Sequence, residues 1–146
     1  MTKKVRPGRK QPQISKIPRK IEDVSSIEES IFKWRVNKQY IDLDHPEWGW
    51  GKLKIEDFFE ILTHRLHDYE SMTWQDLSQR RSCHSMPVKN IVSKAQARLY
   101  EKCPDIDTLY QVDVDRLCRI WGFRDRDFFY LIWHDPNHSV YETKES

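Results

Sequence analysis

Two dense runs of apolar and aromatic residues near the C-terminus dominate the hydrophobic pattern of this chain. They are Leu117–Phe123 and Phe128–Trp133, and the polar tetrapeptide Arg124-Asp125-Arg126-Asp127 separates them. Both runs are short, rich in aromatic and branched residues and bounded by turn-forming residues, which predicts the two antiparallel strands of a hairpin. The second run is apolar on both faces, as expected of a strand that is covered on each side. We therefore expect it to be a central strand.

Alternation of apolar and polar residues predicts two further strands, at Phe32–Val36 and Leu109–Val114. The clearest helix is expected over Lys54–Glu70, where apolar residues recur at helical spacing as one continuous stripe. That stripe consists of Ile55, Phe58, Phe59, Leu62, Leu66 and Tyr69.

Two shorter helices are expected after that segment. Thr73 and Asp76 have the spacing of a capping box, which predicts a helix of one or two turns. Ser85 is expected to cap the next helix, with Pro87 in its first turn and Pro104 beyond its end. The buried stripe of this helix is predicted to be Val88, Ile91, Val92, Ala95 and Leu99.

The order of these elements predicts an α+β fold. We expect a mainly antiparallel sheet of about four strands, with the two main helices packed on one face. The segment His45–Gly51 contains one proline and two glycines, so it is predicted to be a loop. Its two tryptophans, Trp48 and Trp50, are expected to close over the core.

Charge divides the chain into two parts. Residues 1–20 hold eight of the 25 Lys and Arg residues and no acid, which leaves 17 basic against 23 acidic residues in the remainder. With three prolines and little to bury, residues 1–20 are predicted to be a disordered basic arm, and residues 21–146 one compact domain. The arm could be a solubilising tail, or it could contact RNA or an acidic partner. The acidic body does not suit a protein that grips nucleic acid with its whole surface.

Three cysteines, Cys83, Cys103 and Cys118, form no C-x-x-C motif and leave one over. This pattern favours a reducing compartment over a disulfide framework or a zinc site. The chain has no apolar run approaching the about 18 residues of a membrane-spanning helix and no apolar segment typical of a secretion signal. We expect a cytoplasmic protein that does not enter a membrane.

Several familiar catalytic motifs are absent from the sequence. It has no glycine-rich phosphate loop, no G-x-S-x-G motif and no helical pair of metal-binding histidines. The run His134-Asp135-Pro136-Asn137-His138 could bind a transition metal, but a turn in which the Asp135 side chain bonds backbone amides is the simpler interpretation. We therefore expect no metal and no cofactor.

The candidate functional residues are arginines and histidines on or beside the C-terminal hairpin. Arg119 shares a strand face with aromatic residues, so it should either pair with an acid or bind an anion. Metal-free RNA cleavage needs a base, an acid and a cation, which histidine and arginine can supply. The proton-transfer candidates are His138, His84, His134 and, as a supporting acid or stacking group, Tyr141; the substrate-binding candidates are Arg119, Arg124, Arg126 and Lys89. Strand geometry favours a pocket of Arg119, His134, His138 and Tyr141, with His84 arriving from a loop.

The run R-I-W-G-F-R at residues 119–124, followed by F128 and the run W-H-D-P-N-H-S-V-Y at 133–141, resembles the signature of a family of small bacterial proteins. Many of these proteins occur on mobile elements. Trp74 and His84 are similar to an upstream Trp and His of the same family. The resemblance covers residues 73–141 and is specific as a signature, but it implies little about activity.

The predicted element order, β-α-α-β-β-β, is similar to that of the RelE/YoeB/ParE toxin superfamily. Ribonuclease members of that superfamily cut mRNA in the ribosomal A site with His, Arg, Lys, Glu and Tyr residues on the sheet. The resemblance implies the toxin of a toxin–antitoxin or phage-defence system, a metal-independent ribonuclease whose partners are a cognate antitoxin and RNA, including ribosome-bound mRNA. The alternative is a non-enzymatic module that docks a partner protein through its aromatic surface. The acidic body departs from the basic character of ribosome-dependent toxins.

Overall fold

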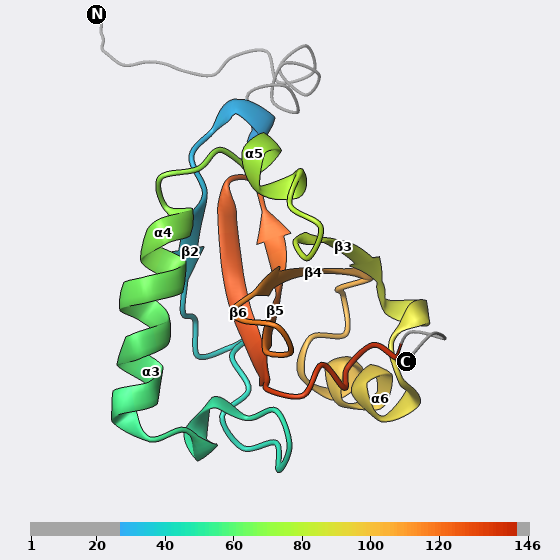
Figure 1. The fold of residues 1–146 in the computed structure, drawn as a ribbon. Coiled ribbons are helices and arrows are strands. Elements are labelled where there is room, and N and C mark those ends of the chain that lie inside the picture. The colour runs from blue at the N-terminus through green and yellow to red at the C-terminus, as the bar shows by residue number, and fades with distance from the viewer. Residues whose placement is uncertain (1–26, 143–146) are drawn as a thin grey trace, which may run out of the picture.

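The computed structural model describes residues 27–142, so the predicted basic arm lies outside the described residues (Figure 1). The fold is α+β, as predicted, and is built around one sheet with the strand order β2-β6-β5-β4-β3. The strands are β2 (Lys33–Arg35), β3 (His84–Pro87), β4 (Thr108–Asp113), β5 (Arg119–Asp125) and β6 (Phe128–Asp135).

The helical elements lie before β3 and between β3 and β4. A long helix consists of α3 (Ile55–Ile61), a π-helical turn η2 (Leu62–Leu66) and α4 (His67–Tyr69). The others are η1 (Trp50–Lys52), α5 (Trp74–Ser78), η3 (Val88–Asn90) and α6 (Ser93–Lys102). Thr73 and Asp76 form the predicted capping box at the start of α5.

The C-terminal hairpin forms as the sequence predicts. Strands β5 and β6 pair antiparallel, and β6 lies inside the sheet between β5 and β2. The sheet has five strands where about four were expected, and one of its pairs, β2 with β6, is parallel. The additional strand is β3, which pairs antiparallel with β4 at the opposite edge.

Strand β3 replaces the predicted beginning of a helix. His84–Pro87 pairs with residues 108–111 of β4, so these residues are extended rather than helical. Pro87 ends a strand at the edge of the sheet, where its missing N–H costs little. The helix α6 therefore begins at Ser93. Of the predicted stripe, Ala95 and Leu99 are buried within α6, and Ile91 is buried in the segment before it.

The two main helices lie on opposite faces of the sheet, so the expectation that they share one face is wrong. Neighbouring strand residues divide between two cores, because side chains of a strand alternate between its faces. Ile120 belongs to a first cluster with residues of the long helix and α5, whereas Trp121 belongs to a second cluster with residues of α6. Trp50 is buried in the first cluster and Trp48 in the second, so both tryptophans of the predicted loop cover the core as expected.

The long helix does not bury the continuous stripe that its sequence predicts. Ile55 and Phe59 are 66% and 53% exposed, while Ile61 and Leu66 are buried. The π-helical turn η2 inserts extra backbone into the helix and rotates the residues on either side of it relative to each other. A prediction that assumes constant helical spacing therefore assigns the wrong residues to the buried face on one side of this turn.

A β-bulge at Gly122 sets the geometry of the sheet end that carries the candidate site. The register shifts between Trp121 and Gly122, so that Ile132 has no partner in β5. A Cβ at Gly122 would lie 2.0 Å from the carbonyl oxygen of Tyr130, so only glycine fits there without displacing that strand. The extra residue of the bulge, Ile132, bends the end of β6, and Asp135 then lies opposite Arg119.

Candidate active site

Buried polar atoms without a hydrogen-bond partner gather at one end of the sheet. Five such side-chain atoms occur among residues 27–142, and three of them are Gln111 Oε1, Arg119 Nε and His138 Nε2. Buried polar groups in folded proteins are almost always paired with protein or ordered water. A group of unpaired atoms therefore marks a place where water or a ligand belongs.

The strand register brings His84 toward the same place. His84 on β3 lies opposite Gln111 on β4, and Gln111 lies opposite Trp121 on β5. Arg119 is two residues from Trp121 and therefore on the same face of β5. Strand spacing and rise put the His84 and Arg119 backbones on the order of 12 Å apart. Two long side chains directed at a phosphodiester can bridge that distance.

His138 lies in a turn that Asp135 holds in place. The buried Asp135 carboxylate accepts hydrogen bonds from the backbone N–H groups of Ser139 and Val140, both at 2.9 Å, and from Trp121 Nε1 at 3.0 Å. This confirms the predicted turn. His138 adopts a φ of 54°, a left-handed conformation that is uncommon for a residue other than glycine. Such strain persists where the surroundings fix the backbone, and it is concentrated at functional sites.

Burial and a neighbouring cation keep the His138 imidazole neutral. Burial lowers the pKa of His138 from its ordinary value near 6.5, and the Arg119 guanidinium lowers it further, while Asp135 opposes both. His84 also contributes to the lowering, so the three side chains lie within electrostatic range of one another. At neutral pH His138 is therefore uncharged, and a proton that it gains is readily given up.

Arg119 is held by backbone carbonyls rather than by an acid. Its Nη1 donates to the carbonyl oxygens of Asp115, Arg116 and Cys118 at 2.9, 3.2 and 3.1 Å. It forms no ion pair with any carboxylate of residues 27–142, so the predicted pairing with an acid does not occur in the described part. Arg119 is 8% exposed, so its positive charge is buried without a carboxylate of the described residues at ion-pair distance.

Gln111 lies beside His84, and nothing in its residue type marked it as a candidate. Its side chain is 3% exposed, and Nε2 lies 3.0 Å from the Ser82 carbonyl oxygen and 3.3 Å from His84 Nε2. An amide carries no charge and no characteristic spacing. The available signal was a polar residue between two apolar residues of the strand, Tyr110 and Val112.

His134 lies on the opposite face of β6, so the expected pocket of His134 with His138 does not form. Its Nε2 is 3.3 Å from Cys118 Sγ, and it lines a cavity of about 480 Å³ beside the long helix. Burial lowers the pKa of His134 and raises the pKa of the Cys118 thiol to about 12. The pair therefore rests as neutral imidazole and thiol, which is a poor nucleophile.

The two arginines of the hairpin tip are not part of the cluster. Arg124 lies at the other end of β5 from Arg119, where it pairs with Glu28 at 3.2 Å and stacks over the Trp74 ring at 4.2 Å. Arg126 is exposed in the turn with a φ of 61°. The structure therefore places neither arginine beside His84, Arg119 and His138.

Lys89 and Tyr141 lie near the second core cluster. Lys89 is exposed and lines a separate cavity of about 480 Å³ together with Gln96 and Tyr100. Tyr141 is half-buried and packs against the second cluster, three residues after His138. Of the predicted site residues, the structure thus groups His84, Arg119 and His138.

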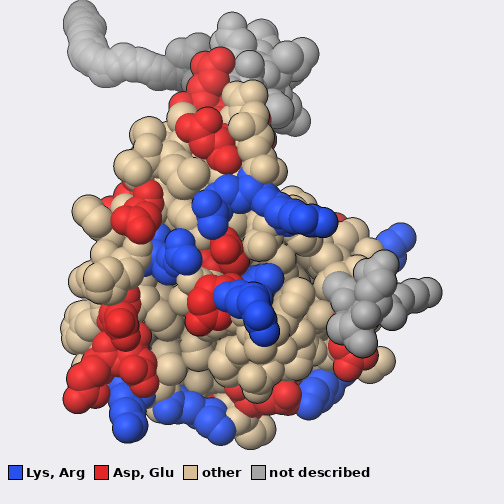
Figure 2. All heavy atoms as spheres, viewed as in Figure 1, with Lys and Arg blue, Asp and Glu red and all other residues tan. Residues whose placement is uncertain are grey.

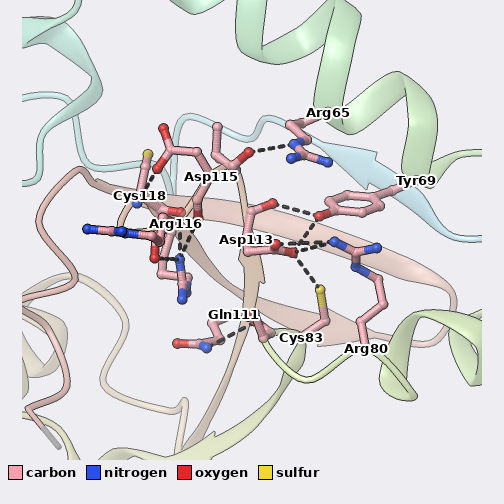
Figure 3. Close-up of polar contacts among 12 residues, drawn as sticks. Arg65, Tyr69, Arg80, Cys83, Gln111, Asp113, Asp115, Arg116 and Cys118 are labelled. Atoms are coloured by element: carbon pink, nitrogen blue, oxygen red, sulfur yellow. Dashed lines mark hydrogen bonds and ion pairs between the residues drawn. The ribbon is translucent and has the colours of Figure 1, made fainter.

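A polar network around Asp113 supports the end of β4 beside this group. Figure 3 shows Tyr69, Arg80 and Cys83 converging on the Asp113 carboxylate, with Tyr69 Oη at 2.6 Å, Arg80 Nη2 at 3.2 Å and Cys83 Sγ at 3.3 Å. Burial would raise the pKa of Asp113, but these hydrogen bonds and the Arg80 charge hold it below its usual value. Burial raises the pKa of Cys83 to about 11. The network ties the long helix and the segment before β3 to β4, opposite Arg119.

We expect the stability of the protein to fall as the pH drops from about 7 to about 5.5. His134 and His138 have lowered pKa values in the folded state, whereas the unfolded chain takes up protons near pH 6.5. Below that pH the unfolded state binds more protons, so the free energy of unfolding decreases with acidification. Urea unfolding at several pH values measures this slope. His134→Gln should reduce the slope; equal slopes for wild type and a folded His134→Gln protein would contradict the assignment.

No family model matches this chain, and no curated protein or solved structure is significantly similar to it. Residues 27–142 contain no helix long and apolar enough to cross a membrane. They also contain no group of three His, Cys, Asp or Glu side chains arranged to hold a metal ion. The resemblance to small mobile-element proteins therefore stays a prediction.

Proposed function

We propose that this protein is an endoribonuclease that works without a metal ion and acts as the toxin of a toxin–antitoxin or phage-defence system. The observation that carries the proposal is the grouping of His84, Arg119 and His138 around buried polar atoms that have no partner in residues 27–142. Two imidazoles and one cation can supply the base, the acid and the charge stabilisation for cleavage of RNA through its own 2′-hydroxyl group. A RelE-like fold stays a prediction that rests on the expected element order, because in the structure a further strand, β3, lies between α5 and α6.

The reaction divides its two proton transfers between the histidines. His84 takes the proton of the 2′-hydroxyl group as its oxygen attacks the adjacent phosphorus. Arg119 stabilises the negative charge that develops on the phosphorane oxygens. His138, protonated beside the bound phosphate, gives its proton to the leaving 5′-oxygen. The products are a 2′,3′-cyclic phosphate and a 5′-hydroxyl end, so no water or metal enters this step.

Surface charge favours a small number of local contacts over a broad RNA-binding face. On the face drawn in Figure 2, Lys and Arg side chains are interspersed with Asp and Glu, and acidic side chains gather over α3. Glu56, Asp57 and Glu60 are the acids of that helix. Electrostatic attraction of RNA is therefore assigned to Arg119 and to the eight cations of residues 1–20.

Purified full-length protein with single-stranded RNA and DNA oligonucleotides in EDTA tests this proposal. We expect RNA to be cut to products with a 2′,3′-cyclic phosphate and DNA to stay intact, because DNA lacks the attacking hydroxyl group. Induced expression should arrest bacterial growth. If the protein neither cuts free or ribosome-bound RNA nor arrests growth, the ribonuclease proposal is wrong.

A second candidate function, docking of a partner protein, is supported by an apolar groove. Val36, Leu43 and Ile55 are 47%, 51% and 66% exposed and line a hollow of about 380 Å³ with Trp50. Exposed apolar residues that cluster in this way often mark protein interfaces. In a toxin the groove suits the cognate antitoxin; in a protein without cleavage activity it would be the main functional surface.

A further inference from the structure

Only one orientation of the Gln111 amide allows a hydrogen bond to the Ser82 carbonyl oxygen. Its terminal nitrogen lies 3.0 Å from the Ser82 carbonyl oxygen, which can only accept a hydrogen bond. A reversed amide would put two oxygens against each other in a position that is 3% exposed. The amide nitrogen therefore faces Ser82, and its second hydrogen is free to be donated elsewhere.

That second hydrogen determines which ring nitrogen of His84 is unprotonated. Gln111 Nε2 lies 3.3 Å from His84 Nε2, so the imidazole nitrogen must accept and cannot carry a proton. On the other side of the ring, His84 Nδ1 lies 3.0 Å from the Ser85 carbonyl oxygen, which requires a proton on Nδ1. The two contacts independently specify the same neutral tautomer.

We propose that Gln111 is a positioning residue that holds His84 as the Nδ1–H tautomer, with an unprotonated Nε2 that faces the Gln111 amide. The pairing of β3 with β4 sets His84 and Gln111 opposite each other, so the backbone maintains the contact. The catalytic consequence rests on the proposed function: the substrate hydroxyl takes the place of the amide at Nε2 and meets a nitrogen ready to accept its proton. The tautomer itself does not depend on that function.

Nitrogen-15 NMR of the histidine rings in the full-length protein tests the proposal directly. Pyrrole-type, pyridine-type and doubly protonated ring nitrogens have well-separated shifts, and His84→Gln identifies the His84 signals by their loss. In wild type we expect Nδ1 to be pyrrole-type and Nε2 pyridine-type at pH 7.5. In Gln111→Glu a carboxylate accepts from Nε2 while Ser85 accepts from Nδ1, so both nitrogens should become protonated.

Gln96→Glu is the matched control, because Gln96 also donates to backbone carbonyls, those of Lys89 and Ile91, but lies on α6. It should leave the His84 shifts unchanged. A wild-type His84 with its proton on Nε2, or a folded Gln111→Glu protein with an unaltered His84 ring, would overturn the proposal. If Gln111→Glu does not fold, the position of the proton on the wild-type His84 ring alone supports or overturns the proposal.

Activity separates this inference from the proposed function. If RNA is cleaved, Gln111→Glu should lower kcat about tenfold or more with little change in KM, because a protonated His84 cannot take the hydroxyl proton. The expected spectra without any cleavage would support the role of Gln111 in fixing the ring and refute the ribonuclease. Cleavage together with the Nε2–H tautomer would refute the role of Gln111 alone.

Discussion

Replacing His138 with asparagine should lower the rate of RNA cleavage by about two to four orders of magnitude while the protein stays folded. That range is typical for loss of a general acid or base. Among residues 27–142, His138 Nε2 has no hydrogen-bond partner, so its removal breaks no internal bond. Asparagine also tolerates the left-handed backbone at this position, where alanine would add strain. Single-turnover cleavage of a short RNA measures the rate, and thermal unfolding checks the fold.

His84→Ala and Arg119→Lys should lower the cleavage rate by a comparable factor. The first variant removes the proposed base, and the second removes the planar guanidinium that can bind a phosphate through two hydrogen bonds. His67→Gln, on the solvent-exposed side of α4, is the control and should cleave at the wild-type rate. Wild-type activity in a folded His138→Asn protein would remove His138 from the mechanism. A loss in folded His134→Gln as large as that in His138→Asn would move the site to the other face of β6.

The sequence was informative about those parts of the fold that depend on local hydrophobic pattern. The doubly apolar run Phe128–Trp133 correctly predicted an internal strand, and the capping box at Thr73 correctly predicted the start of α5. Strand β3 escaped prediction because His84–Pro87 has only four residues, ends in a proline and is extended only through its pairing with β4. The phase of the long helix was wrong because a π-helical turn cannot be read from a regular spacing.

Local sequence also identified some residues of the candidate site, whereas others depend on contacts between distant segments. Arg119 and His138 were identified by residue type and by their position at strand ends, and His84 by residue type and its place in an expected loop. His134 was grouped with His138 because strand geometry puts both at the end of the last strand, yet the extra residue of the bulge, Ile132, decides which face each strand residue occupies. Gln111 was missed because its importance comes from a partner 27 residues away, His84, and an amide has no charge to draw attention to it.

Replacing Arg98 with leucine should destabilise the protein by about 3 to 5 kcal/mol, the usual cost of leaving a buried charge without its partner. The Asp42 carboxylate is fully buried and receives Arg98 Nε and Nη2, both at 2.7 Å, and Trp133 Nε1 at 2.9 Å. Burial would raise the pKa of Asp42, but Arg98 and Trp133 outweigh it and lower the pKa to about 2. Asp42 is therefore charged at neutral pH and joins α6 to the end of β6.

Urea unfolding at pH 7 measures this cost, with Lys94→Ala as the matched control. Lys94 also leads from α6 to an acid, Glu47, but that pair is exposed, so its removal should cost no more than about 1 kcal/mol. The double variant Arg98→Leu/Asp42→Asn should recover part of the loss, because no buried charge remains. In wild type the stabilisation from Asp42 is complete above its ordinary value near pH 4 and is lost as the pH falls toward about 2, a dependence that the double variant should lack. An Arg98→Leu protein as stable as Lys94→Ala would show that Asp42 keeps access to water.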